Sequence, residues 1–177
     1  MGILLKCIKI KLFLTSVLEK PLINTPKRIA FGFSLSSLPL LERLKASNHV
    51  DQIFISDRSD FLLEEKASGL IQSMPKAFLK DHWQKNNQLI FIGSIGAVVR
   101  LISPFVSSKE NDPAILVMDS KAKNIIPLLG GHKQGGDRFA NELSAALEAE
   151  AICTSDSFTE RRIPLDCFGE GWGWKRG

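Results

Sequence analysis

Four glycines surround a single histidine in the segment Leu128-Leu-Gly-Gly-His-Lys-Gln-Gly-Gly-Asp137. Ordering so many glycines is costly in chain entropy unless the backbone has to bend sharply or approach a ligand closely. An imidazole exchanges a proton near neutral pH, which suits His132 to general acid–base catalysis. We therefore predict that His132 is catalytic, the alternative being a flexible loop with a solvated histidine. The backbone of the same turn is predicted to bind the substrate at Gly130, Gly131, Gly135 and Gly136.

A second candidate site is the segment Gly93-Ser-Ile-Gly-Ala-Val-Val-Arg100. Glycines between a strand and a helix let backbone N–H groups approach an anion. Arg100, two helical turns further on, could bind a carboxylate through its guanidinium. The segment lacks the complete spacing of a dinucleotide fingerprint, so it is weak evidence for a nucleotide. We predict substrate binding here, the alternative being tight strand–helix packing, and the residues concerned are Gly93, Ser94, Gly96 and Arg100.

Two more charged residues flank a later apolar run, 114–118. Lys109 precedes it and Asp119 follows it, and both are predicted to bind substrate. Asp112, directly before Pro113, is better suited to starting a turn. Cys153 is expected to be a small buried hydrophobic residue rather than a nucleophile. The sequence has no Cys/His spacing typical of a metal site, so no metal is expected.

Apolar runs alternate with amphipathic segments along most of the chain. Strands are predicted at 28–34, 52–56, 89–93, 114–119 and 151–154, helices at 36–45, 75–85, 95–102 and 137–148, and a short extended segment at 124–129. Strands that are apolar throughout are typical of a parallel sheet covered on both faces. The prediction is therefore an α/β, doubly wound (Rossmann-like), mostly parallel sheet with helices on both faces. Ligands bind such sheets beyond the carboxyl ends of the strands, so we expect all the candidate residues to share one rim.

The 177 residues favour one domain with flanking segments, and 44% of them are hydrophobic, enough for a sizeable core. The net charge of +4 comes from residues 1–28, and the rest of the chain is close to neutral. Nucleic-acid binding is therefore not expected. No apolar stretch is long enough to span a membrane, and three cysteines form no disulfide framework. We expect a cytoplasmic protein with a basic extension (1–27), an α/β domain (28–159) and a glycine-rich tail (160–177).

Several segments also occur in the order and at the spacing of a known family. They are 91–104, Lys109 with Asp112-Pro-Ala114, 126–132 and Gly135-Gly136. Together they resemble the CbiG family, the cobalt-precorrin-5A hydrolases of cobalamin biosynthesis. Its pattern reads approximately Gly-Ala-Thr-Gly-Ile-Ala-Val-Arg, then Lys with Asp-Pro-Ala, then Leu-Leu-Ser-Gly-His followed by Gly-Gly-Ala-Asn. The resemblance is continuous over residues 85–156.

The chain departs from this pattern at three places. Ser94-Ile95 replaces Ala-Thr, Gly130 replaces Ser, and Asp137-Arg138 replaces Ala-Asn. Residues 171–177 resemble the Gly-Trp-Arg-Arg-Gly stretch before the family's C-terminal domain, which in some bacteria is joined to precorrin-3B C17-methyltransferase. We therefore expect the sequence to be truncated before a further domain.

The resemblance implies a cobalt-containing tetrapyrrole substrate with a δ-lactone on ring A. The implied reaction opens the lactone with water and breaks a carbon–carbon bond, releasing acetaldehyde. His132 would be the acid–base group, and Arg100 and Lys109 would bind carboxylates of the macrocycle. Cobalt would arrive in the substrate, so no cofactor is expected, and the expected partners are this cobalt corrinoid and a fused or separate precorrin methyltransferase. Two alternatives remain: a non-catalytic tetrapyrrole-binding module serving that methyltransferase, and a phosphate- or nucleotide-binding domain.

Overall fold

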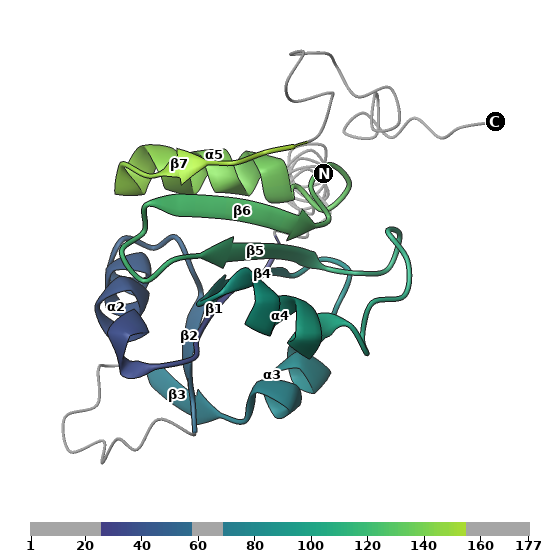
Figure 1. Cartoon of the computed structure of the whole chain (residues 1–177), viewed down its shortest axis with the longest axis horizontal. Coiled ribbons are helices and arrows are strands. Elements are labelled where there is room, and N and C mark those ends of the chain that lie inside the picture. The colour runs from purple at the N-terminus through teal and green to yellow at the C-terminus, as the bar shows by residue number, and fades with distance from the viewer. Residues whose placement is uncertain (1–25, 58–68, 155–177) are drawn as a thin grey trace, which may run out of the picture.

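The computed structural model describes residues 26–57 and 69–154, which form a seven-stranded sheet covered by helices (Figure 1). The strands are β1 (Arg28–Gly32), β2 (Gln52–Ser56), β3 (Leu70–Ser73), β4 (Gln88–Ile92), β5 (Ala114–Met118), β6 (Asn124–Leu129) and β7 (Glu150–Ala151). The helices are η1 (Leu35–Ser37), α2 (Leu38–Ala46), α3 (Pro75–His82), α4 (Ile95–Ile102) and α5 (Gly136–Leu147).

The strand order is β3-β2-β1-β4-β5-β6-β7, and the first five strands of the chain are parallel. β6 pairs with β5 in the antiparallel direction, and β7 runs parallel to β6. We call the edge where β1–β5 end the carboxyl edge, and the edge where they begin the amino edge. Because β6 is reversed, its last residue, Leu129, lies opposite Ile115 at the start of β5. The turn after β6 is therefore at the amino edge.

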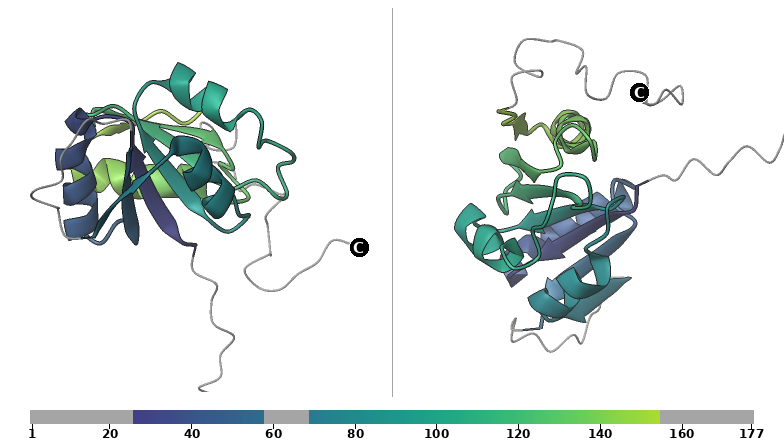
Figure 2. Two further views of the ribbon diagram at one scale, coloured as in Figure 1. Left: turned by 90° about the horizontal axis from the view of Figure 1, so that it is seen from below. Right: turned by 90° about the vertical axis from the view of Figure 1, so that its right-hand side faces the viewer.

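Two apolar cores fill the space between the sheet and its helices. α2 and α5 cover one face, where Leu41, Leu44, Phe139 and Leu143 are fully buried. α3 and α4 cover the other face, where Phe31, Phe78 and Phe91 pack as a cluster of rings. The two layers of helices lie on opposite sides of the sheet (Figure 2). The doubly wound α/β prediction is confirmed.

Most predicted elements are present, with small differences at their ends. The helix at 95–102 and the strand at 52–56 are found with the predicted bounds. β3 was not predicted, because only Leu70 of its residues is buried and no apolar run marks it. The apolar residues on the buried side of α5 are Phe139, Ala140, Leu143 and Leu147, and Ala146 is exposed.

The start of the first helix also differs from the prediction. The helix predicted at 36–45 begins at Leu38 instead, because Ser36 lies inside the 3₁₀ turn η1, where its hydroxyl is 2.8 Å from that of Ser34. The predicted extension at 1–27 and tail at 160–177 lie almost entirely outside the described residues. In the described part of the chain, no helix combines the length and apolar character needed to cross a membrane.

Candidate functional site

The glycine-rich turn after β6 is a compact structure held by its own backbone. The carbonyl of Gly130 accepts hydrogen bonds from the Gly136 and Gln134 amides, at 3.1 and 3.2 Å. Gly130 has φ +68°, and a Cβ at this position would lie 2.9 Å from the Cα of Ala114. The turn therefore requires glycine here, both for its left-handed backbone and for its close packing on the start of β5.

His132 is paired with a carboxylate inside this turn. Its Nδ1 lies 3.2 Å from Oδ2 of Asp137, whose side chain is only 11% exposed. Gly131 makes this approach possible, because a Cβ there would stand 2.7 Å from Oδ1 of Asp137. Asp137 also lies in the first turn of α5, where the helix dipole favours a negative charge. From the sequence, Asp137 stood out only as a departure from the family pattern. Its place at the start of the helix that follows His132 could have indicated a partner for the histidine.

The pair has the chemistry of an oriented acid–base group. When Nδ1–H donates to the carboxylate, Nε2 is the basic nitrogen, and the carboxylate stabilises the imidazolium that forms when it takes a proton. The side chain of His132 is 25% exposed, so the ring is held by the protein yet accessible. Such an arrangement can take a proton from water and return it to a leaving group.

Asn141 and Cys153 extend the cluster away from the turn. Asn141 donates from Nδ2 to the backbone carbonyl of Asp137 at 2.6 Å, and the same nitrogen lies 3.9 Å from Sγ of Cys153. Burial and the negative charge of Asp137 raise the pKa of the Cys153 thiol. Cys153 is consequently protonated at neutral pH and is a poor nucleophile. This agrees with its predicted role as a packing residue.

Lys109 lies on the loop between α4 and β5, which reaches the same amino edge. Lys133, next to His132, forms an ion pair with Glu110 of that loop at 3.4 Å. The loop is fixed by Asp112, which is 4% exposed and accepts hydrogen bonds from the amide and hydroxyl of Ser107. Asp112 therefore has the structural role expected for it, and the loop holds Lys109 on the side of the histidine turn.

The Gly93–Arg100 segment lies at the carboxyl edge instead. Ser94 is the N-cap of α4, and its hydroxyl accepts from the amide of Ala97 at 3.4 Å. Nη1 of Arg100 donates to the carbonyl of Gly96 at 3.0 Å, so the guanidinium folds back onto the first turn of its own helix. The local polar groups mainly close the start of α4.

Asp119, also at the carboxyl edge, is occupied by the protein itself. Its carboxylate accepts hydrogen bonds from three backbone amides of the β5–β6 turn, those of Lys121, Lys123 and Asn124, at 2.8 to 2.9 Å. Burial alone would raise the pKa of Asp119, but the amide donors outweigh it and hold the pKa below its usual value. The structure thus gives Asp119 a turn-closing role, and its contact with substrate stays a prediction.

The expectation of one shared rim is wrong. Gln88 contacts the histidine turn through Nε2, which donates to the carbonyl of Gln134 at 2.9 Å, whereas Gly93 follows Ile92 at the other end of β4. Four strand residues at about 3.3 Å each place the two turns about 13 Å apart along the sheet. The cause is the reversal of β6, which carries the His132 turn to the opposite edge from Arg100.

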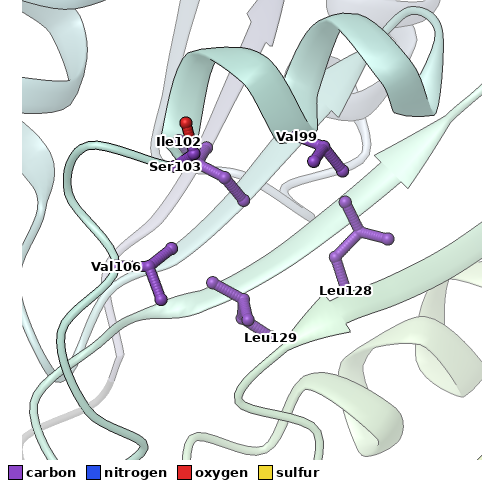
Figure 3. Close-up of a pocket in the computed structure, with 6 residues that line it drawn as sticks. All are labelled: Val99, Ile102, Ser103, Val106, Leu128 and Leu129. Carbon is purple, nitrogen blue, oxygen red and sulfur yellow. The ribbon is translucent and has the colours of Figure 1, made fainter.

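An apolar groove runs between α4 and β6 (Figure 3). Its volume is about 470 Å³. Val99 and Val106 are nearly half exposed there. The groove ends beside Leu129, the residue before the histidine turn, on the face of the sheet that α3 and α4 cover. Its lining, which the sequence analysis did not single out, consists of Val99, Ile102, Ser103, Val106, Leu128 and Leu129.

Over residues 26–57 and 69–154, no three His, Cys, Asp or Glu side chains lie close enough to hold a metal ion.

Known proteins resemble this chain in the region of the site. Residues 77–157 match the family described as Cobalamin synthesis G N-terminal. A cobalt-precorrin-5A hydrolase of Priestia megaterium is 36% identical over 111 residues, covering 63% of this chain and 30% of the relative. That of Salmonella typhimurium is 36% identical over 78 residues, 44% of this chain and 22% of the relative. The chain thus spans less than a third of the length of either relative.

A solved structure supports the fold. A cobalamin biosynthesis protein G homolog from Sulfolobus solfataricus superposes with a TM-score of 0.54 at 24% identity, over 75% of this chain and 39% of that one. The resemblance to the CbiG family is confirmed for the α/β domain, including both glycine turns and Lys109.

Proposed function

We propose, from the premise that this domain is the N-terminal part of a CbiG-type protein, that the chain acts in cobalamin biosynthesis as part of a cobalt-precorrin-5A hydrolase. The relatives of that name match it at 36% identity, over a fraction of their length. The observation that carries the proposal is the His132–Asp137 pair, 3.2 Å apart and accessible in the matched region. The substrate would be the cytoplasmic cobalt-corrinoid intermediate with its ring A δ-lactone, and cobalt would belong to that substrate.

His132 is assigned the proton transfers of this reaction. Nε2 accepts a proton from water as the water oxygen adds to the lactone carbonyl, and the acyl–oxygen bond then breaks. The freed hydroxyl loses its proton as the adjoining carbon–carbon bond breaks, acetaldehyde leaves, and the ring carbon takes up a proton. Asp137 is a positioning residue: it fixes the tautomer of His132 and stabilises the imidazolium between these steps.

The rest of the amino edge suits binding of the same molecule. The apolar groove offers surface for the hydrophobic face of a macrocycle, and Lys109 offers a charge for a peripheral carboxylate. The amides of Gly130 and Gly131 are the nearest candidates for an oxyanion site, because those of Gly135 and Gly136 donate to carbonyls of the turn itself. Substrate contacts at Gly93, Ser94, Gly96 and Arg100 stay predictions, and they require a ligand that extends along α4 to the carboxyl edge.

A second candidate, a non-catalytic module that holds the tetrapyrrole for a precorrin methyltransferase, is favoured by one observation. Asp137, the partner of the histidine, stands where the family pattern has Ala. An alanine cannot pair with a histidine, so the family pattern does not contain the His132–Asp137 pair. A catalytic role for it has to be measured directly.

The test is acetaldehyde release from cobalt-precorrin-5A by the full chain, with Asp137→Ala, which restores the family residue, beside the wild type. We expect turnover from the wild type, a loss of about tenfold or more in kcat for Asp137→Ala, and a changed pH profile, because the imidazole loses its orienting charge. Asn141→Ala, which leaves the carboxylate in place, is the matched control. Binding of the substrate without acetaldehyde would support the module instead.

A further inference from the structure

A polar cavity of about 580 Å³ opens at the amino edge, on the side of the sheet that α5 covers. Three separate segments line it: the start of β1, the loop between α2 and β2, and the first turn of α5. Basic groups dominate the lining, which includes Lys27, Arg28, His49, Asp51 and Arg138. None of these residues was singled out as a site residue by the sequence analysis.

The cavity has a rigid wall, formed by Arg28. Its guanidinium carbon lies 4.0 Å from the ring centroid of Phe139, and its Nε donates to Oε1 of Gln88 at 3.0 Å. Nη2 forms an ion pair with Glu142. Stacking and two polar contacts hold the guanidinium in one orientation, so little entropy is lost when it meets a ligand.

The opposite wall is adjustable and is formed by Arg138. The side chain of Arg138 is 73% exposed, and its only ion pair among the described residues is a long one, 3.7 Å, with the same Glu142. Two guanidinium groups thus share one carboxylate, that of Glu142, while Asp51 accepts the amide of Arg28 at 2.7 Å. Lys27 also lines the cavity, but strand residues alternate between faces, and its charge acts on His82 of α3 on the other face of the sheet.

This cavity is joined directly to the histidine turn. Gln88 is 1% exposed; its Oε1 accepts from Arg28, and its Nε2 donates to the carbonyl of Gln134 at 2.9 Å. Nη2 of Arg138 would lie 3.5 Å from a Cβ at Gly135, so the basic wall touches the turn from the other side as well. A group bound in the cavity is therefore adjacent to the element that carries His132.

We propose that this basic cavity binds a carboxylate of the ligand on which His132 acts, with Arg138 as the contacting residue and Arg28 as the fixed wall. A carboxylate, that of Glu142, already bridges the two arginines, which shows that their spacing suits this group. The identity of the ligand as a tetrapyrrole polycarboxylate rests on the proposed function. The anion site itself rests on the geometry.

The experiment measures binding of uroporphyrin, a polycarboxylated tetrapyrrole, to the full chain by fluorescence titration. Arg138→Gln removes one charge from the cavity, and Lys121→Met removes one from the opposite edge as the matched control. We expect the first variant to bind about tenfold more weakly and the control to stay within about twofold of the wild type. Equal losses in both variants, or no loss in the first, would overturn the proposal. Displacement of bound uroporphyrin by an equal concentration of inorganic phosphate would also overturn it, because the site would then bind any anion.

The cavity and the proposed function fail separately. Uroporphyrin binding that depends on Arg138 without any acetaldehyde release would contradict the hydrolase function and support the anion site. Acetaldehyde release with an unchanged KM in Arg138→Gln would contradict the anion site and leave the hydrolase function intact. The side chain of Arg138 is exposed, so circular dichroism is expected to show an unchanged fold in this variant.

Discussion

The two edges of the sheet carry similar polar residues and use them differently. At the carboxyl edge, Asp119 closes a hairpin with three amides, and Arg100 binds a carbonyl of its own helix. At the amino edge, His132 is paired with a carboxylate and remains a quarter exposed, beside cationic side chains. Polar groups that satisfy the backbone stabilise the fold, whereas oriented and accessible groups can do chemistry. The proposed catalytic chemistry therefore belongs to the amino edge.

The largest expected difference between the edges is in turnover. His132→Gln should lower acetaldehyde release by about 10²–10³-fold, because it removes the proton acceptor. Arg100→Gln should cost about tenfold at most, in KM rather than kcat. Steady-state kinetics with cobalt-precorrin-5A measures both. Equal losses in kcat would remove the distinction between the edges.

Glycines at the two edges should respond to alanine in opposite ways. Gly130→Ala forces a side chain into left-handed backbone against the Cα of Ala114, and should lower the free energy of unfolding by about 2–3 kcal/mol. Gly96→Ala lies in helix α4, where its Cβ would meet only the movable end of Arg100, and should raise it by about 0.5 kcal/mol. Urea unfolding checks both values. Destabilisation by Gly96→Ala would show a tightly constrained carboxyl edge.

Asp119→Ala tests the structural assignment of the carboxyl edge through its pH dependence. We expect a loss of about 1–2 kcal/mol at neutral pH, because three amides lose their acceptor. Folding lowers the pKa of Asp119, so its contribution is present above the unfolded pKa and is lost as pH falls through the folded one. Urea unfolding at pH 7 and at about pH 3 should therefore show a smaller difference from the wild type in acid. A difference that is independent of pH would contradict the assignment.

The smallest effect is a change in thiol reactivity at the amino edge. The charge of Asp137 helps to raise the pKa of Cys153, after burial. Asp137→Asn should lower that pKa and speed alkylation of Cys153 at pH 8 by about two- to fivefold. Site-resolved mass spectrometry of iodoacetamide-treated protein measures the rate. Lys121→Met is the control, and an unchanged rate in Asp137→Asn would place the carboxylate away from the thiol.

The central part of the fold could be predicted from local signals. The helix at 95–102 has an N-cap serine and an apolar stripe, and the strand before it is entirely buried, so pattern and structure agree. The direction of β6 was not predicted, although the sequence held a signal for it. Only residues 119–123 separate β5 from β6, and a parallel crossover needs a dozen residues or more. A short link of this kind allows only a hairpin.

The candidate site could be predicted only in part, because some of its residues carry local signals and others depend on the direction of β6. Its glycines and histidine stand out in composition, so His132 could be found without coordinates. The partners of His132 and the basic cavity depend on which edge the turn reaches, and that follows from strand direction. Arg28 and Gln88 could not be identified from the sequence, because they contact each other across 60 positions of the chain.

The buried amide of Gln88 also limits which ligand arms the basic cavity can accept. If Arg28 moved outward to meet a ligand, Oε1 of Gln88 would lose the hydrogen bond it accepts from the guanidinium, at a cost of about 1–3 kcal/mol. A ligand arm too short to reach Arg28 in place would therefore bind more weakly by this amount. The cavity therefore selects acidic arms that are long enough to reach Arg28 in its fixed position, while Arg138 adapts around them.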